Sequence, residues 1–247
     1  MKVISYNVKT GTPTPERAES VIKNITDFDA DIVGTQEINF KWLRVLEESG
    51  FFDTYAMIGK SRHAPDEMTT ANEYSSIFYK KDMFDVIDSG TKWLSETPDE
   101  VSRLETSKYY RIMTYAVFER KSDGVRFLHV NTHLDFIPAN PVQIGIMLDL
   151  VKELGYDLPT MYTGDFNMYR KIHEGYPIMI EAGTDDSEDI ALEVHVVRRP
   201  HRIGKTIDFC FLTKGDFDVQ KYERYDLPGS DHDPVCVTLD IIKKEEV

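Results

Sequence analysis

The feature that most limits the fold of this chain is a series of short apolar runs, most of which end in polar residues. Short runs rich in β-branched and aromatic residues are typical of buried strands. They span residues 3–8, 32–36, 74–79, 84–93, 111–118, 125–134, 159–165, 207–212 and 235–242. The sequence therefore predicts a fold rich in strands.

Helical signals lie between these strands. Thr14 is a suitable N-cap, and Pro15 fits the first position of the helix that follows. Further helices are expected over about 40–48 and 141–154, and Gly155 ends the second of them. Because helices and antiparallel-looking strands are mixed rather than strictly alternating, the sequence favours two sheets flanked by helices over a parallel doubly wound sheet. We expect an α+β fold with one domain over residues 1–247.

Composition limits the partners and the compartment. With 29 basic and 43 acidic residues the net charge is −14, which disfavours tight binding of duplex DNA. Cys210 and Cys236 lie in apolar runs and are expected to be buried free thiols. We expect a cytoplasmic monomer without membrane insertion, because no signal peptide or membrane span is visible, unless a secretion signal has been removed.

Polar residues at the strand ends are the main functional signal. They are Asn7, Glu37, His133, Asp165, Asn167, Asp208 and the pair Asp231-His232. Each has a structural alternative: Asn7 could start a turn, Glu37 could cap the next helix, and Asn167 could form an Asx turn. As a group they are difficult to explain by packing, because buried charge is costly unless it is paired or metal-bound.

The residue types in this group indicate the chemistry. Oxygen ligands such as Glu37, Asp231 and the Asn7 amide suit Mg²⁺ or Mn²⁺, which keep bound waters and bind phosphate. The group therefore predicts hydrolysis of a phosphate ester with a divalent cation, an oriented water and donors for developing charge.

Six stretches in a fixed order support a more specific hypothesis. They are Ser5-Tyr6-Asn7-Val8, Gln36-Glu37, Asn131-Thr132-His133-Leu134-Asp135, Gly164-Asp165-Phe166-Asn167, Ile207-Asp208-Phe209 and Ser230-Asp231-His232-Asp233-Pro234-Val235. From Asn7 to Val235 the chain resembles the endonuclease/exonuclease/phosphatase superfamily. That resemblance implies the DNase I-like fold, a four-layer α/β/β/α sandwich with two mainly antiparallel sheets.

The resemblance also implies roles for individual residues. Glu37 resembles the principal metal ligand, assisted by Asn7 and Asp231. His232 resembles the histidine that contacts the scissile phosphate, either as the base or as a stabiliser of the transition state. Asp208 resembles the carboxylate that orients it.

Further roles follow from the same resemblance. Asp165 and Asn167 resemble the pair that positions the attacking water and holds a phosphate oxygen. His133 resembles a second active-site histidine, and Glu73 the acid that pairs with it. Arg111 could reach the phosphate or be a surface arginine.

Some positions depart from parts of the superfamily. Lys9 stands where apurinic endonucleases carry an acid, and His133 where they carry a tyrosine, so abasic-site repair is disfavoured. A basic run, Arg198-Arg199-Pro200-His201-Arg202 with Lys205, could bind phosphate or be a solvated loop. Trp93 could stack on a base or lie in the core.

Three hypotheses remain at this level. The leading one is a Mg²⁺- or Mn²⁺-dependent phosphoesterase that hydrolyses a diester or monoester of a phosphorylated small molecule. The second is a metal-dependent nuclease for single-stranded or short nucleic acid, and the third is a catalytically silent binding protein. The complete set of expected site residues disfavours the third.

Overall fold

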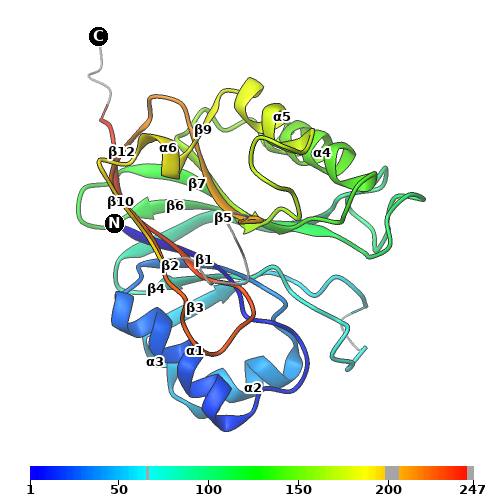
Figure 1. Ribbon diagram of the computed structural model, residues 1–247, viewed down its shortest axis with the longest axis vertical. Helices are drawn as coiled ribbons and strands as arrows, with labels where there is room; N and C mark the ends of the chain where they lie inside the picture. The colour runs from blue at the N-terminus through cyan, green and yellow to red at the C-terminus, as the bar shows by residue number, and fades with distance from the viewer. Residues whose placement is uncertain (65–66, 198–205, 244–247) are drawn as a thin grey trace.

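The chain forms two sheets stacked face to face, with helices on both outer surfaces (Figure 1). The structure is a computed structural model and describes residues 1–64, 67–197 and 206–243. The first sheet has the order β10 (Glu193–Val196), β12 (Phe217–Arg224), β13 (Val235–Ile241), β1 (Lys2–Asn7), β2 (Ile32–Gln36), β4 (Ile77–Lys80) and β3 (Tyr55–Ile58). The second has the order β5 (Phe84–Trp93), β6 (Ile112–Arg120), β7 (Arg126–His133), β8 (Thr160–Asp165), β11 (Asp208–Thr213) and β9 (Thr184–Asp186).

Helices complete the four layers. Those outside the first sheet are α1 (Pro15–Phe28), α2 (Phe40–Glu48) and α3 (Phe51–Thr54), and those on the second sheet's side are α4 (Ala139–Glu153), α5 (Gly175–Glu181) and α6 (Ser187–Ile190). Neighbouring strands are mostly antiparallel, but β1 pairs with β2, β10 with β12 and β7 with β8 in parallel. The predicted four-layer sandwich is confirmed.

Three apolar clusters hold the layers together. One fills the space between the sheets and includes Ile32, Phe118 and Val237. A second packs the second sheet against α4 and α5, and a third packs the first sheet against α1, α2 and α3. None of the helices that the structure describes is long and apolar enough to cross a membrane.

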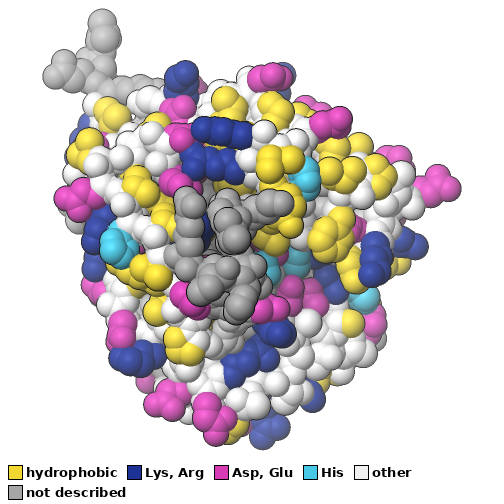
Figure 2. All heavy atoms as spheres, in the orientation of Figure 1, with side chains coloured by type: hydrophobic (Ala, Val, Ile, Leu, Met, Phe, Trp, Pro, Cys, Tyr) yellow, Lys and Arg dark blue, Asp and Glu magenta, His cyan; other side chains and the backbone are white. Residues whose placement is uncertain are grey.

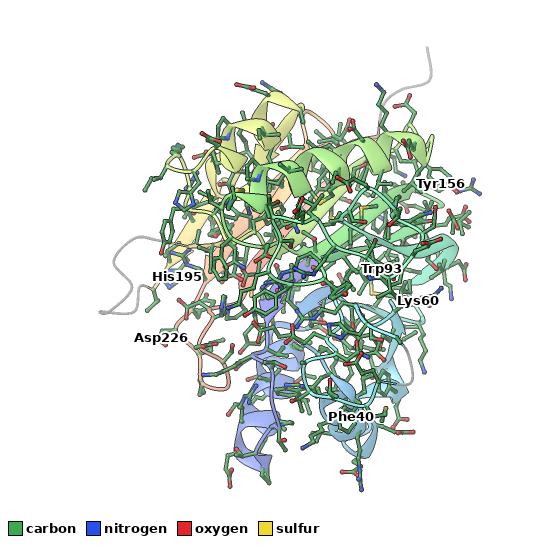
Figure 3. The ribbon with its side chains drawn as sticks, turned by 90° about the vertical axis from the view of Figure 1, so that its right-hand side faces the viewer. Phe40, Lys60, Trp93, Tyr156, His195 and Asp226 are labelled. Carbon is green, nitrogen blue, oxygen red and sulfur yellow. The ribbon has the colours of Figure 1, made fainter. Side chains whose placement is uncertain are left out.

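Several sequence predictions can be checked directly. Thr14 caps α1, with its side chain accepting from the backbone N–H of Arg17, and Pro15 is the first helical residue. Both cysteines are buried and free. Trp93 belongs to the core, where its Nε1 donates to the carbonyl of Arg62 at 2.8 Å. In Figure 3, His195 lies near one edge of the molecule and Trp93 lies farther inside it.

A polar network crosses the space between the sheets below the ends of β1 and β2. The Asn131 amide on β7 donates to the carbonyls of Thr35 and Ser76 at 2.8 and 2.9 Å. Its Oδ1 accepts from Gln36 Nε2 at 2.8 Å and from the Thr163 hydroxyl at 3.0 Å. One side chain therefore fixes the spacing of the two sheets next to Glu37.

Gly34 on β2 faces this network. A Cβ atom there would lie 2.2 Å from Thr163 Oγ1 and 2.6 Å from Asn131 Oδ1. Neither atom can move freely because both are hydrogen-bonded inside the core. We expect Gly34→Ala to lower the free energy of unfolding by roughly 2–3 kcal/mol, as overpacked cores do, and urea unfolding measures it.

Gly145→Ala is the matched control. Gly145 lies in α4, and a Cβ atom there would have no neighbour within 4 Å. That substitution should leave stability unchanged or raise it by about 0.5–1 kcal/mol, because alanine is the better helix former. Equal unfolding midpoints for the two variants would contradict the close packing proposed around Gly34.

Candidate active site

The expected site residues meet at one rim of the sandwich. Asn7, His133 and Asp165 end strands β1, β7 and β8, and Asp208 begins β11. Glu37 directly follows β2, and the pair Asp231-His232 precedes β13. Figure 2 shows histidine and acidic side chains together near the centre of this face.

Glu37 is held by the loop that follows β1. Its Oε1 accepts from the Asn7 amide at 3.0 Å, and its Oε2 accepts from the backbone N–H of Thr10 at 2.6 Å. Glu37 has a φ of 65°, a left-handed conformation that is uncommon for a residue with a side chain. It does not cap the next helix, because Asn39 accepts from the first N–H groups of α2.

The Asn7 amide group lies between two carboxylates. Its Nδ2 donates to Glu37 Oε1 and to Asp165 Oδ2, at 3.0 Å in each case. Its Oδ1 accepts from the backbone N–H of Lys9 at 2.9 Å. Asn7 is fully buried and joins the two sheets at the floor of the site.

His232 and Asp208 form a close pair. His232 Nδ1 lies 2.9 Å from Asp208 Oδ2 and 3.1 Å from Oδ1. The other ring nitrogen, Nε2, lies 3.7 Å from Asp165 Oδ2. Asp208 therefore holds the imidazole through its Nδ1.

His133 approaches the same carboxylate oxygen. Its Nε2 lies 3.6 Å from Asp165 Oδ2 and 3.3 Å from Asn167 Nδ2. Asn167, which has a φ of 48°, also donates to the carbonyl of Leu134 at 2.8 Å. One oxygen of Asp165 thus faces the Asn7 amide and both imidazoles.

Charge and burial act differently on the two histidines. Burial would lower the pKa of His232, but the surrounding carboxylates, Asp208 first, outweigh it and raise that pKa to about 10. Burial, together with the charges of Arg111 and Arg62, holds the pKa of His133 well below its ordinary value. Burial and the adjacent Asp208 raise the pKa of Asp165.

Two expected residues, Glu73 and Asp231, have partners that the sequence did not indicate. Glu73 pairs with Arg62 at 2.8 Å rather than with His133, and both of these side chains are buried. Glu73 and His133 nevertheless line one small cavity of about 10 Å³. Asp231 Oδ2 lies 3.2 Å from Lys9 Nζ.

Arg111 is a buried residue of the rim and not a surface arginine. It is 4% exposed, lines the same cavity, and its Nε has no hydrogen-bond partner among the described residues. Its guanidinium lies 4.8 Å from the centre of the Tyr109 ring. The basic run at residues 198–205 lies outside the described residues.

Sequence reasoning missed two residues of this rim. Thr10 supplies a backbone N–H to Glu37, and Arg62 supplies the charge that faces Glu73. Thr10 lies in the polar segment after the first strand and could have been considered. Nothing in the sequence around Arg62 marks it, because its role depends on how a long connection folds back.

Comparisons with known proteins agree with this geometry. A sequence model described as "Endonuclease/Exonuclease/phosphatase family" matches residues 4–232. A comparison with curated protein sequences found no significant match.

Solved structures show the same fold. An endonuclease/exonuclease/phosphatase from Bacteroides vulgatus is 29% identical, with a TM-score of 0.85 and 98% of each chain covered. A mannosyl-6-phosphatase from Bacteroides thetaiotaomicron is 28% identical, with a TM-score of 0.85 and coverage of 97% of this chain and 99% of that chain. The human Nocturnin catalytic domain, 15% identical over 98% of this chain and 94% of its own, has a TM-score of 0.74 and shows the fold alone. With 229 consecutive residues matched by the family's sequence model, from 4 to 232, this chain belongs to the endonuclease/exonuclease/phosphatase family.

Proposed function

We propose that this protein is a divalent-metal-dependent phosphoesterase that hydrolyses a phosphate ester of a small molecule, with a phosphorylated sugar as the first candidate. The observation that carries the proposal is the meeting of Asn7, His133 and His232 around one oxygen of Asp165. The sugar follows from the 28% identical mannosyl-6-phosphatase, which shares nearly the full chain length.

Glu37 and Asp231 would hold the cation. Their carboxylates form a donor set of oxygen atoms, which suits Mg²⁺ or Mn²⁺. The Asn7 amide hydrogens occupy the space between Glu37 and Asp165, where two negative groups require a positive partner. When bound, the cation would supply Lewis-acid stabilisation of charge on a phosphoryl oxygen.

A second group could also attract a metal ion. Ligand atoms of Asp165, Asp208 and His232 lie within 4.8 Å of one another. In this group, the His232 imidazole is within hydrogen-bond distance of both oxygens of Asp208. In addition, hard cations such as Mg²⁺ bind imidazole poorly. We therefore assign these three residues to catalysis and not to metal binding.

The remaining side chains would act on the substrate. The Nε2 atoms of His232 and His133 lie 3.7 and 3.6 Å from the same oxygen of Asp165, so both imidazoles would donate to oxygens of a phosphoryl group bound beside it. Asp165 would orient the attacking water and accept its proton, and Asn167 would hold a phosphate oxygen. Arg111 would add positive charge, with Glu73 and Arg62 fixing its surroundings.

A substrate panel tests the proposal. We expect sugar 6-phosphates and p-nitrophenyl phosphate to be hydrolysed with Mg²⁺ or Mn²⁺, and turnover to vanish in His232→Ala. Inositol phosphates, nucleotides, bis-p-nitrophenyl phosphate and single-stranded oligonucleotides belong in the same panel. Turnover confined to oligonucleotides, weakening steeply with salt, would establish the nuclease instead. Silence on every phosphoester would leave only a binding role.

A further inference from the structure

We infer that Arg17 is a positioning residue for this site, because its guanidinium joins the loop that follows Asn7 to the loop that carries His232. The inference rests on the proposed function. Arg17 does not contact the catalytic side chains through any described hydrogen bond, and its partners are backbone carbonyls on both loops.

The place of Arg17 in its helix is unfavourable for helix stability. It lies in the first turn of α1, three residues after the cap Thr14. The N-terminal end of a helix carries partial positive charge, so acidic residues are favoured there and a cation is not. The hydrogen bonds from Arg17 to carbonyls of the two loops offset this unfavourable interaction.

The contacts of Arg17 are shared between the loops. Its Nε donates to the carbonyl of Gly229 at 3.0 Å. Its Nη2 donates to the carbonyl of Val8 at 2.8 Å and also contacts the carbonyls of Lys9 and Thr10. A planar guanidinium can hold several acceptors in fixed directions, whereas a lysine ammonium cannot reproduce this geometry.

The Arg17 guanidinium lies over the ring of Trp42. The Arg17 guanidinium lies 5.0 Å from the centre of the Trp42 ring, and Trp42 Nε1 donates to the carbonyl of Lys9 at 3.1 Å. Trp42 is fully buried between α2 and the first sheet. The contacts of Arg17 with the two loops therefore rest on a well-packed part of the core.

Helix α1 also holds the second loop elsewhere. Asn24, two turns after Arg17, donates to the carbonyl of Pro228 at 2.9 Å. Gly229 has a φ of 108°, and a Cβ atom there would lie 2.9 Å from Val21. In Figure 1 the loop between β12 and β13 runs across α1.

Both loops position groups of the proposed site. Thr10 gives its backbone N–H to Glu37, and Ser230 donates to the carbonyl of Asn7 while accepting from the backbone N–H of His232. A shift of either loop would change the distance between Glu37 and His232. Misplacement of catalytic groups by about 1 Å can cost about 100-fold in rate.

Two variants separate positioning from simple attachment. Arg17→Ala removes the link between the loops, and we expect kcat to fall about 100-fold with the substrate KM changed little. Added methylguanidinium should restore part of the rate, because Arg17 lines an open hollow of about 500 Å³ beside Ser230 and Asp231. Asn24→Ala removes one hydrogen bond between the same helix and the same loop but leaves the Arg17 contact with Gly229 in place, so it should keep kcat within about threefold.

Amide hydrogen exchange gives a readout that does not depend on activity. Arg17→Ala should speed exchange in both 8–10 and 228–232, and Asn24→Ala only in 228–232. The inference is overturned if Arg17→Ala keeps the wild-type rate, or if it fails to loosen both loops. An inactive wild-type protein would contradict the proposed function, and the exchange data would still decide whether Arg17 couples the loops.

Discussion

Replacement of His232 by alanine is expected to lower kcat by about 1,000-fold or more, because general acid–base groups and oxyanion donors each contribute 10²–10⁴-fold. His232 Nδ1 is bound by Asp208 at 2.9 Å, which directs Nε2 to the space beside Asp165. Without the imidazole, a phosphoryl group above Asp165 loses a donor and faces two carboxylates. The substitution should therefore weaken binding of the transition state more than binding of the ground state.

Steady-state kinetics on the wild-type protein and three variants measures this effect. Asp208→Asn keeps the shape of the carboxylate but removes its charge, so a loss smaller than that of His232→Ala is expected. His195→Ala is the matched control: His195 lies on the edge strand β10 against the Tyr225 ring, 5.2 Å between ring centres. Thermal unfolding shows whether each variant folds. A folded His232→Ala protein with a near-normal kcat would remove His232 from the chemistry.

The place of the site could be predicted from sequence because strand ends carry the information. Apolar runs predict strands, and polar residues that close them predict one rim when the strands share a sandwich. Asn7, Glu37 and Asp208 were found in this way, and the structure brings them to one rim. The helix expected over about 40–48 is α2, whose observed ends are Phe40 and Glu48.

The parts that failed share a physical cause. Strand β12 was not predicted because Phe217–Arg224 contains five polar residues and its inner face is buried only by the fold. The predicted pairing of Glu73 with His133 was wrong, because Arg62 pairs with Glu73 instead. The register of the sheets, which puts Gly34 against Asn131 and Thr163, depends on contacts between distant segments. Such pairings have no signal in one sequence.

The bridging position of Asn7 was also beyond sequence reasoning. Its residue type predicted a ligand oxygen, but the structure directs the amide hydrogens at Glu37 and Asp165. Glu37 and Asp165 are both carboxylates, and the neutral Asn7 amide between them does not cancel their charge. A cation bound beside Glu37 would neutralise this negative charge, so a change at Glu37 should alter metal binding.

Glu37→Gln is expected to lower activity by about 100-fold or more at a fixed Mg²⁺ concentration, because the variant loses the main charged oxygen of the proposed site. Glutamine keeps the size of the side chain and an oxygen for the backbone N–H of Thr10, so the left-handed turn should be retained. Removal of divalent ions with EDTA should abolish wild-type turnover, and added Mg²⁺ or Mn²⁺ should restore it.

The metal concentration at half-maximal rate then locates the cation. It should rise strongly in Glu37→Gln and stay unchanged in Glu48→Gln, since Glu48 lies on the exposed side of α2 and pairs with Arg44. Glu37→Gln could instead keep the wild-type metal concentration at half-maximal rate, while Asp165→Asn requires much more metal. In that case the cation would bind at Asp165, Asp208 and His232. That result would exchange the proposed roles of the two groups: Asp165 and Asp208 would bind the metal, and Glu37 and Asp231 would bind substrate.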